Sequence, residues 1–251
     1  MKQFFFSTLI LVSFSACQSS SNSNQAAADS TSAANASPDS GWVTLFDGNS
    51  LKGWHSYGQP TADVNWNVDS GTIHLQPDPK KTFHPKTDGE ADLVTDDVFG
   101  NFDLKLEWRI GKKSNSGIIF YVQDDTSKFK ETWTSGMEMQ VCDKDSNEDA
   151  HSLKHEAGDL YDLISSTVMS AKGYGEWNKV EIISNKSKLD LYLNGVNVVS
   201  TTLWDDKWKQ LISGSKFKDM PGFGTFTTGH VALQGGEGGE VWYRNIMVKK
   251  L

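Results

Sequence analysis

Glu138 and Gln140 are the polar side chains whose type and spacing are best suited to chemistry. They alternate with Met137, Met139 and Val141, and successive side chains of a β-strand point to opposite faces of its sheet. The apolar set is therefore expected to pack inside, which leaves the carboxylate and the amide together on an open face. There, Glu138 can act as a general base or a metal ligand, and Gln140 can orient a bound ligand. The alternative is a solvated polar strand face.

Two histidines in one polar segment are further candidate bases. His151 and His155 precede Gly158 in a stretch that is expected to be a loop. Histidine changes its protonation state near neutral pH, which suits it to general-base catalysis. An exposed loop histidine without a catalytic role is the alternative. Shortly beyond, Tyr161 is expected to begin a strand, where it can donate a hydrogen bond to an oxyanion or simply pack.

The acidic run over residues 143–149 has alternating oxygen-bearing side chains, as a calcium-binding loop does. The sixth position is Glu148, where such a loop needs glycine, and the twelfth is Lys154, where it needs a bidentate glutamate. An EF-hand is therefore disfavoured. A different divalent-metal site that uses Glu138, Asp143 and a histidine stays open, and the sequence establishes no cofactor.

The elements that must position these groups have the period of β-strands. Alternating and short apolar runs predict strands at residues 104–110, 117–122, 137–141, 179–183, 189–193, 196–199, 229–234 and 241–248. Residues 185–188 and Asn194-Gly195 are hairpin signals. One helix is expected over residues 203–212, with Thr202 as its cap. This pattern predicts an all-β fold, a two-sheet antiparallel β-sandwich with one short helix.

The N-terminal residues resemble signals for export and lipidation. Lys2 and the apolar run 4–12 are typical of a secretory signal peptide, and Ser15-Ala16 before Cys17 resembles a bacterial lipobox. Residues 1–17 are thus predicted to be a lipoprotein-type signal peptide with Cys17 lipidated. Residues 18–40, which lack aromatic side chains, are predicted to be a flexible tether, and residues 41–251 a single β-sandwich domain. We expect a cell-envelope location, facing the periplasm or the surface, with a lipid anchor in the membrane.

Composition excludes several classes of protein. The chain has 24 Lys and Arg against 32 Asp and Glu, and no basic stripe, which argues against binding of nucleic acid. Beyond the N-terminus no apolar run approaches the roughly 20 residues of a membrane span. Cys142 is the one cysteine after residue 40 and is expected to be packed. GxSxG, P-loop, GxGxxG and HExxH motifs are absent, so any chemistry must come from residues on separate strands.

Eight blocks of residues together resemble the 3-keto-disaccharide hydrolase domain family, and they occur in family order over residues 41–251. The blocks are GWVTLFDG at 41–48, LKGW at 51–54, FDL with EWR at 102–109, NSGI at 115–118, GMEMQV at 136–141, GDLYDL at 158–163, GEWN at 175–178 and RNI at 244–246. The resemblance implies a concanavalin-like jelly roll. It also implies an exported bacterial protein, in many members a lipoprotein, that acts on glycosides oxidised at C3.

The implied substrate sets the chemistry. A ketone at C3 acidifies the proton on C2, so the protein must supply a base and a stabiliser for the enediolate oxyanion before the C1 substituent leaves. The resemblance makes Glu138 and His155 the catalytic candidates. Glu138 stands inside the GMEMQV block, and His155 is the histidine nearer the GDLYDL block. The candidate substrate contacts are Gln140, Tyr121, Trp133, Tyr161, Gln234 and Arg109. Arg109 shares a strand face with Glu107, and an ion pair between them is the alternative.

Two departures from the family pattern concern the expected sugar groove. Tyr121 stands where the family commonly has arginine, and residues 235–239 are glycine-rich where it commonly has Asp-His-Gly after Leu-Gln. Three functions therefore stay open: an enzyme that cleaves 3-keto-glycosides by elimination or hydrolysis, a carbohydrate-binding module without catalysis, and an envelope protein without a sugar site. A groove that holds Glu138, Gln140 and His155 would favour the enzyme.

Overall fold

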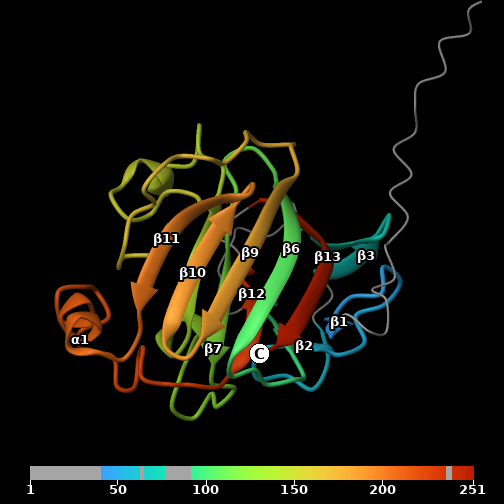
Figure 1. Ribbon diagram of the computed structural model, residues 1–251. Coiled ribbons are helices and arrows are strands. Elements are labelled where there is room, and N and C mark those ends of the chain that lie inside the picture. Colours follow the sequence, from blue (N-terminus) through green and yellow to red (C-terminus); the bar gives the residue numbers. More distant parts are fainter. Residues whose placement is uncertain (1–40, 63–64, 77–91, 236–238) are drawn as a thin grey trace, which may run out of the picture. The chain divides into compact units, whose positions relative to one another are not determined.

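The structure is a computed structural model that describes residues 41–62, 65–76, 92–235 and 239–251. These residues form two antiparallel sheets (Figure 1). The predictions for residues 1–40, including the lipidation of Cys17, lie outside the described residues. No helix among the described residues is long and apolar enough to cross a membrane.

The larger sheet has the strand order β11-β10-β9-β6-β13-β4-β3, and β1 also pairs with β13. Its strands are β1 (Trp42–Thr44), β3 (Trp66–Asp69), β4 (Thr72–Leu75), β6 (Phe102–Ile110), β9 (Asn178–Asn185), β10 (Lys188–Leu193), β11 (Val196–Thr202) and β13 (Val241–Lys250). The smaller sheet has the order β2-β5-β12-β7-β8. Its strands are β2 (Trp54–Ser56), β5 (Leu93–Thr95), β7 (Asn115–Val122), β8 (Met137–Cys142) and β12 (His230–Leu233). The predicted all-β sandwich is confirmed, and the interleaved strand order is that of a jelly roll.

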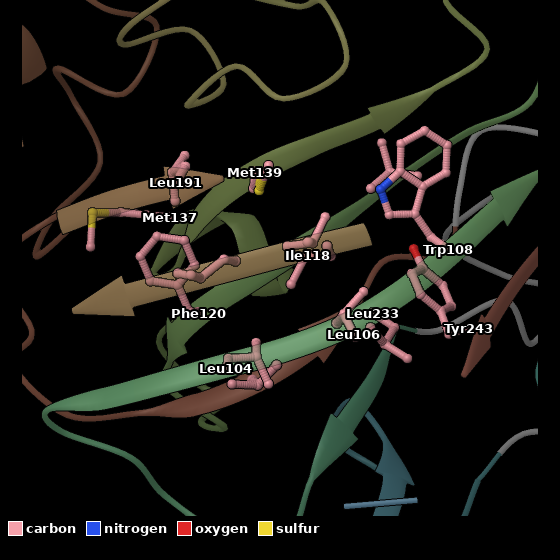
Figure 2. Close-up of a cluster of buried hydrophobic side chains, with 14 of the residues drawn as sticks. Leu104, Leu106, Trp108, Ile118, Phe120, Met137, Met139, Leu191, Leu233 and Tyr243 are labelled. Carbon is pink, nitrogen blue, oxygen red and sulfur yellow. The ribbon is translucent and has the colours of Figure 1, made fainter. Parts of the chain in front are cut away.

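The core lies between the two sheets. Along β6 buried and half-buried residues alternate, with Leu104, Leu106 and Trp108 inward. Figure 2 shows these side chains together with Ile118 and Phe120 of β7 and with the inward methionines of β8. This packing confirms the inside-outside assignment that the alternation predicts for both strands.

The eight strands predicted from alternating and short apolar runs are all present, and both predicted hairpins are confirmed. Lys186 and Ser187 between β9 and β10, and Asn194 and Gly195 between β10 and β11, all have positive φ angles. Positive φ at both central residues is the signature of the type I′ turn, which matches the twist of paired strands.

The helix begins later than predicted. Helix α1 spans Asp206–Ser213, and its N-cap is Asp205, whose side chain accepts a hydrogen bond from the Trp208 backbone N–H. Thr202, the predicted cap, ends β11, and Trp204 has a left-handed φ of 65°. Aspartate caps a helix at least as well as threonine, and the left-handed residue interrupts the backbone before the helix, so the predicted start was wrong.

Tyr121 lies in the core and not in a groove. The register of β12 against β7 shifts at this point, because His230 pairs with Val122 and Val231 pairs with Phe120. Tyr121 is the extra residue of this β-bulge, with a φ of 63°. A bulge reverses the alternation of faces that follows it. The Tyr121 side chain is consequently only 1% exposed, and its hydroxyl hydrogen-bonds to Ser184 and the Gly100 carbonyl.

Candidate functional site

A polar cavity of about 130 Å³ lies on the outer face of the smaller sheet. Its lining residues come from seven separate parts of the chain: Asn115, Trp133, Glu138, Gln140, Asp149, Tyr161, Lys216 and Gln234. A larger cavity of about 580 Å³ adjoins it, and Asn115, Asp149 and Tyr161 line both. The other residues of the larger cavity are Lys113, Ser146, Asn147, Glu148 and Ser152. The larger volume falls within the range of ligand pockets, roughly 300–1,000 Å³.

Glu138 and Gln140 face the cavity from β8, as the alternation predicts. Their neighbours Met137, Met139 and Val141 belong to the core. Glu138 is only 7% exposed, and Gln140 is 1% exposed. A carboxylate in such a position is shielded from bulk water but still reaches the cavity, which is the setting in which a carboxylate can act on a bound ligand.

The Glu138 carboxylate lies across Gly117 of β7. A Cβ atom on residue 117 would stand 2.6 Å from Cδ and 2.8 Å from Cγ of Glu138, which is closer than the roughly 3.5–4.0 Å of favourable carbon contacts. The glycine in the NSGI block is thus needed because the carboxylate approaches the backbone closely.

Tyr161 reaches the cavity from a loop that follows the edge of β8. The Tyr161 backbone N–H donates to the Glu138 carbonyl at 2.9 Å, and the Gly158 N–H donates to the Gln140 carbonyl at 2.9 Å. Leu160 forms only isolated bridges, so the predicted strand at Tyr161 was wrong. The loop pairs with β8 for a few residues and turns at Asp162, which has a φ of 58°.

Asp149 connects several residues beside the cavity. Its Oδ2 accepts hydrogen bonds from the Tyr161 hydroxyl at 3.2 Å and from Gln140 Nε2 at 3.4 Å. Its Oδ1 lies 2.6 Å from Nδ1 of His155. His155 is not among the lining residues of either cavity. The structure therefore places the predicted catalytic histidine behind the cavity wall.

Lys216 brings a positive charge to the same wall. Its Nζ lies 4.1 Å from the ring centroid of Tyr161 and 5.5 Å from that of Trp133, distances typical of cation–π contacts. The His155 ring stacks on Tyr161 with centroids 4.2 Å apart. The Tyr161 ring therefore contacts both an ammonium group and an imidazole, and its hydroxyl is the group that it can offer to a ligand. Trp133 lines the same cavity and is half-buried.

Asp92 supports two walls of the cavity. Its carboxylate accepts hydrogen bonds from the Thr132 hydroxyl and from the Gly235 backbone N–H, the latter at 2.8 Å. These donors are the sequence neighbours of Trp133 and Gln234. Burial raises the pKa of Asp92 to about 6, although both hydrogen bonds act to lower it.

The predicted metal ligands are not brought together. Asp143 is fully buried, and its carboxylate accepts hydrogen bonds from Lys113 N, Asp145 N and the Ser146 hydroxyl. Burial acts to raise the pKa of Asp143, but these donors outweigh it and lower the pKa. In the described part of the chain no group of three His, Cys, Asp or Glu side chains could hold a metal ion. The described residues therefore give no support to a site of Glu138, Asp143 and a histidine.

Arg109 belongs to the other sheet. It lies on β6 with its Cζ 4.3 Å from the ring centroid of Trp242 and 5.1 Å from that of Trp177. Glu107 pairs with Arg244, whose Nε lies 2.9 Å from the Glu107 Oε2. Arg109 does not line the cavity. It also does not pair with Glu107, because Glu107 pairs with Arg244 and the Arg109 guanidinium packs on the two tryptophan rings.

Of the predicted site residues, the structure brings Glu138, Gln140, Trp133, Tyr161 and Gln234 into one cavity, with His155 directly behind it. Sequence reasoning missed Asn115, Asp149 and Lys216 as lining residues, and Asp92 as a supporting one. Asn115 stands in a block that resembles the family, and Asp149 ends the acidic run, so both carried a weak signal. Lys216 stands in the loop after α1 and carried none.

Comparisons with known proteins show which family the chain resembles. A domain family described as 3-keto-α-glucoside-1,2-lyase-like matches residues 41–249. A curated protein of Bacteroides thetaiotaomicron named 3-keto-disaccharide hydrolase is 33% identical over 237 residues, which cover 84% of this chain and 79% of that protein.

Solved structures are similar as well. The crystal structure of a candidate glycosyl hydrolase from Parabacteroides distasonis has a TM-score of 0.74 at 25% identity, and the match covers 84% of this chain and 94% of that one. A second structure from that organism has a TM-score of 0.63 at 24% identity, with 84% and 99% covered, and shows the fold alone. With a family model that matches almost all of residues 41–251 and a curated relative at 33% identity, the chain belongs to the 3-keto-α-glucoside-1,2-lyase-like domain family.

Proposed function

We propose that this protein is an enzyme that cleaves 3-keto-glycosides through removal of the C2 proton. The observation that carries the proposal is the presence of a buried carboxylate, Glu138, and an ammonium group, Lys216, in one polar cavity. Abstraction of a proton beside a ketone needs a base together with a positive group where oxyanion charge develops. Family membership and the curated relative named 3-keto-disaccharide hydrolase support the same substrate class.

In the proposed mechanism Glu138 takes the proton from C2. The C–H electrons form a C2–C3 double bond, and the ketone oxygen becomes an oxyanion, which Lys216 stabilises. When the C3 carbonyl forms again, the electrons shift to a C1–C2 double bond and the C1–oxygen bond breaks. The proton on Glu138 passes to the departing oxygen, directly or through water. Water then adds across the double bond, with its oxygen to C1 and a proton to C2, and the net reaction is hydrolysis.

The remaining lining residues are assigned to substrate positioning. Trp133 offers a ring face for the sugar, since apolar C–H faces of sugars pack well on aromatic rings. Gln140, Asn115 and Gln234 carry amides that can both donate to and accept from hydroxyl groups. A mechanism with two carboxylates that flank an oxocarbenium-like centre is not proposed, because that chemistry leaves C2 untouched and has no need of an oxidised sugar.

The test compares a 3-keto-glucoside with its unoxidised parent, using the purified full chain. We expect aglycone release from the oxidised glycoside alone, slower release when C2 carries deuterium, and solvent deuterium at C2 of the sugar product. Equal cleavage of both glycosides, or release with no effect of C2 deuterium and no exchange, would contradict the proposal. Saturable sugar binding without turnover would instead assign a binding module. Parallel reactions with EDTA test whether the reaction needs a metal ion. Activity that is lost on chelation and restored by a divalent cation would show that it does.

We also propose that the protein is exported and tethered to the cell envelope by lipidated Cys17. The proposal rests on the signal-like residues 1–17 and the tether-like residues 18–40. Bacteria that express the chain and are fed radioactive palmitate should yield a labelled protein. Cys17→Ser should remove the label, and Cys142→Ser, at the other cysteine of the chain, should keep it. A wild-type protein without label would overturn the tether.

A further inference from the structure

The His155 side chain contacts Asp149, Asp162 and Tyr161 but lines neither cavity. Its Nδ1 lies 2.6 Å from Oδ1 of Asp149, and its Nε2 lies 3.4 Å from Oδ1 of Asp162. Its ring stacks on Tyr161 at an interplanar angle of 21°. The short contact to Asp149 is in the range of a charge-assisted hydrogen bond, whereas 3.4 Å is a weak one. The histidine is therefore held mainly through Nδ1 and its ring face.

Asp149 connects His155 to two residues that line the cavity. The oxygen that does not face His155 accepts from the Tyr161 hydroxyl and from Gln140 Nε2. When Tyr161 donates its one proton to Asp149, its oxygen can present only lone pairs to the cavity. The position of Asp149 thus decides that Tyr161 acts as an acceptor toward a bound ligand.

Tyr161 and Asp149 lie on the boundary between the two cavities. Both residues line the smaller cavity, which holds Glu138, and the larger one. If the oxidised ring occupies the smaller cavity and the departing group occupies the larger one, the bond that breaks crosses this boundary. A displacement of these two residues then affects the reacting bond and not just the affinity for the sugar. Misplacement by about 1 Å can cost about a hundredfold in rate.

We propose that His155 is a positioning residue that, through its Nδ1 contact with Asp149, fixes the Tyr161 hydroxyl as a hydrogen-bond acceptor at the scissile bond. This inference rests on the proposed function. It assigns His155 no contact with substrate and no proton transfer. It also predicts a feature of the substrate, a hydroxyl next to the scissile bond that donates to Tyr161.

Substitution of His155 by asparagine or glutamine distinguishes the contact of Nδ1 from the contact of Nε2. An asparagine amide can place an N–H near the position of Nδ1, and a glutamine amide near that of Nε2. Turnover of a 3-keto-glucoside is measured for the full chain with His155→Ala, His155→Asn and His155→Gln. His151→Ala is the matched control, because His151 is an exposed histidine in the same loop.

We expect kcat to fall about tenfold to a hundredfold in His155→Ala, with KM changed less than threefold. His155→Asn should recover most of kcat, His155→Gln should resemble His155→Ala, and His151→Ala should match the wild type. Melting temperatures are recorded for all variants, so that a loss of kcat can be separated from a loss of folding.

Several outcomes would overturn the inference alone. These are an unchanged kcat in His155→Ala, equal impairment of the asparagine and glutamine variants, or a loss of activity that only follows the melting temperatures. If His155→Ala does not fold, the comparison of His155→Asn with His155→Gln decides. A wild-type protein without turnover would overturn the proposed function itself, and the inference with it, which distinguishes the two failures.

Discussion

Two histidines of this sandwich have the same arrangement of partners in different settings. His55, in β2, has Asp96 at 2.7 Å from Nδ1 and Asp124 at 2.9 Å from Nε2. His155 likewise has a carboxylate at each ring nitrogen. The two clusters differ in what else their carboxylates touch. In the His55 cluster, Asp124 accepts a hydrogen bond from the backbone N–H of Gly58. In the His155 cluster, Asp149 accepts hydrogen bonds from two side chains that line the cavity.

The difference assigns a separate role to each cluster. His55 connects β2 with the loops that follow β5 and β7, so we expect it to contribute to stability. His155 lies behind Asp149 and Tyr161, so we expect it to contribute to activity. An Asp–His–Asp arrangement therefore does not by itself indicate catalysis, and the partners of its carboxylates decide what it does. Both roles can be tested by substitution.

The largest effect is expected at Glu138, because it is the proposed base in the cavity beside His155. Glu138→Gln keeps the shape of the side chain but removes the base, so kcat should fall about 10²- to 10⁴-fold. Glu181→Gln is the control, since Glu181 pairs with Lys105 on the larger sheet. Steady-state turnover of a 3-keto-glucoside checks both. Comparable activity in the two variants would remove the cavity from the mechanism.

Lys216→Met should give the next largest loss. Removal of the positive charge that faces the oxyanion is expected to lower kcat about 10²- to 10³-fold, while the methionine keeps an unbranched apolar side chain. Lys218→Met serves as the control, because Lys218 is an exposed lysine two residues further on. Equal rates for the two variants, measured in the same assay, would show that Lys216 has no role in stabilising the oxyanion.

Gly117→Ala should displace the Glu138 carboxylate without removing it. The added methyl group would overlap the Glu138 side chain, and a misplaced base is expected to lower kcat by about a hundredfold or less. Gly100→Ala is the matched control, as a Cβ there meets its nearest atom at 3.4 Å. Kinetics at saturating substrate check the pair. A Gly117→Ala protein with full activity would mean that the position of the carboxylate is not critical.

His55→Ala should lower stability and leave activity intact. Loss of hydrogen bonds to charged groups costs about 1.5–3 kcal/mol, and for a protein of this size that lowers the melting temperature by roughly 5 °C. Thermal unfolding and kcat are measured together, with His151→Ala as the control. A fall in kcat at temperatures where the variant is folded would break the distinction between the two clusters.

The smallest effect concerns pH. Burial acts to lower the pKa of His55, but its hydrogen bonds to Asp96 and Asp124 outweigh burial and raise the pKa above 6.5. A raised pKa in the folded state means that the stabilisation is complete below about pH 6.5 and is lost as the pH rises through the folded-state pKa. The difference in melting temperature between wild type and His55→Gln should therefore shrink as pH increases. A difference that grows with pH would contradict this sign. His230, whose ring lies 6.3 Å away, is present in both proteins.

The fold was largely predictable because strand alternation is local. The inward positions of β6 and β8 follow from side chains that point alternately to the two faces of a sheet. Glycine or asparagine at the hairpin turns indicates how neighbouring strands connect. Tyr121 shows the limit of this reasoning, since one extra residue in β7 reverses the face of a side chain. Nothing in the sequence around Tyr121 indicates that bulge.

The sequence by itself determined that Glu138 and Gln140 share one face of a strand, and that the family blocks occur in order. Only the tertiary structure decided which residues join them. Lys216 is 78 residues from Glu138 along the chain, and it reaches the cavity because Asp162 binds its backbone N–H at 2.7 Å. Local periodicity reports which face of an element a residue occupies. The contacts between distant loops depend instead on turns, bulges and single hydrogen bonds, so the role of His155 became apparent only in the folded protein.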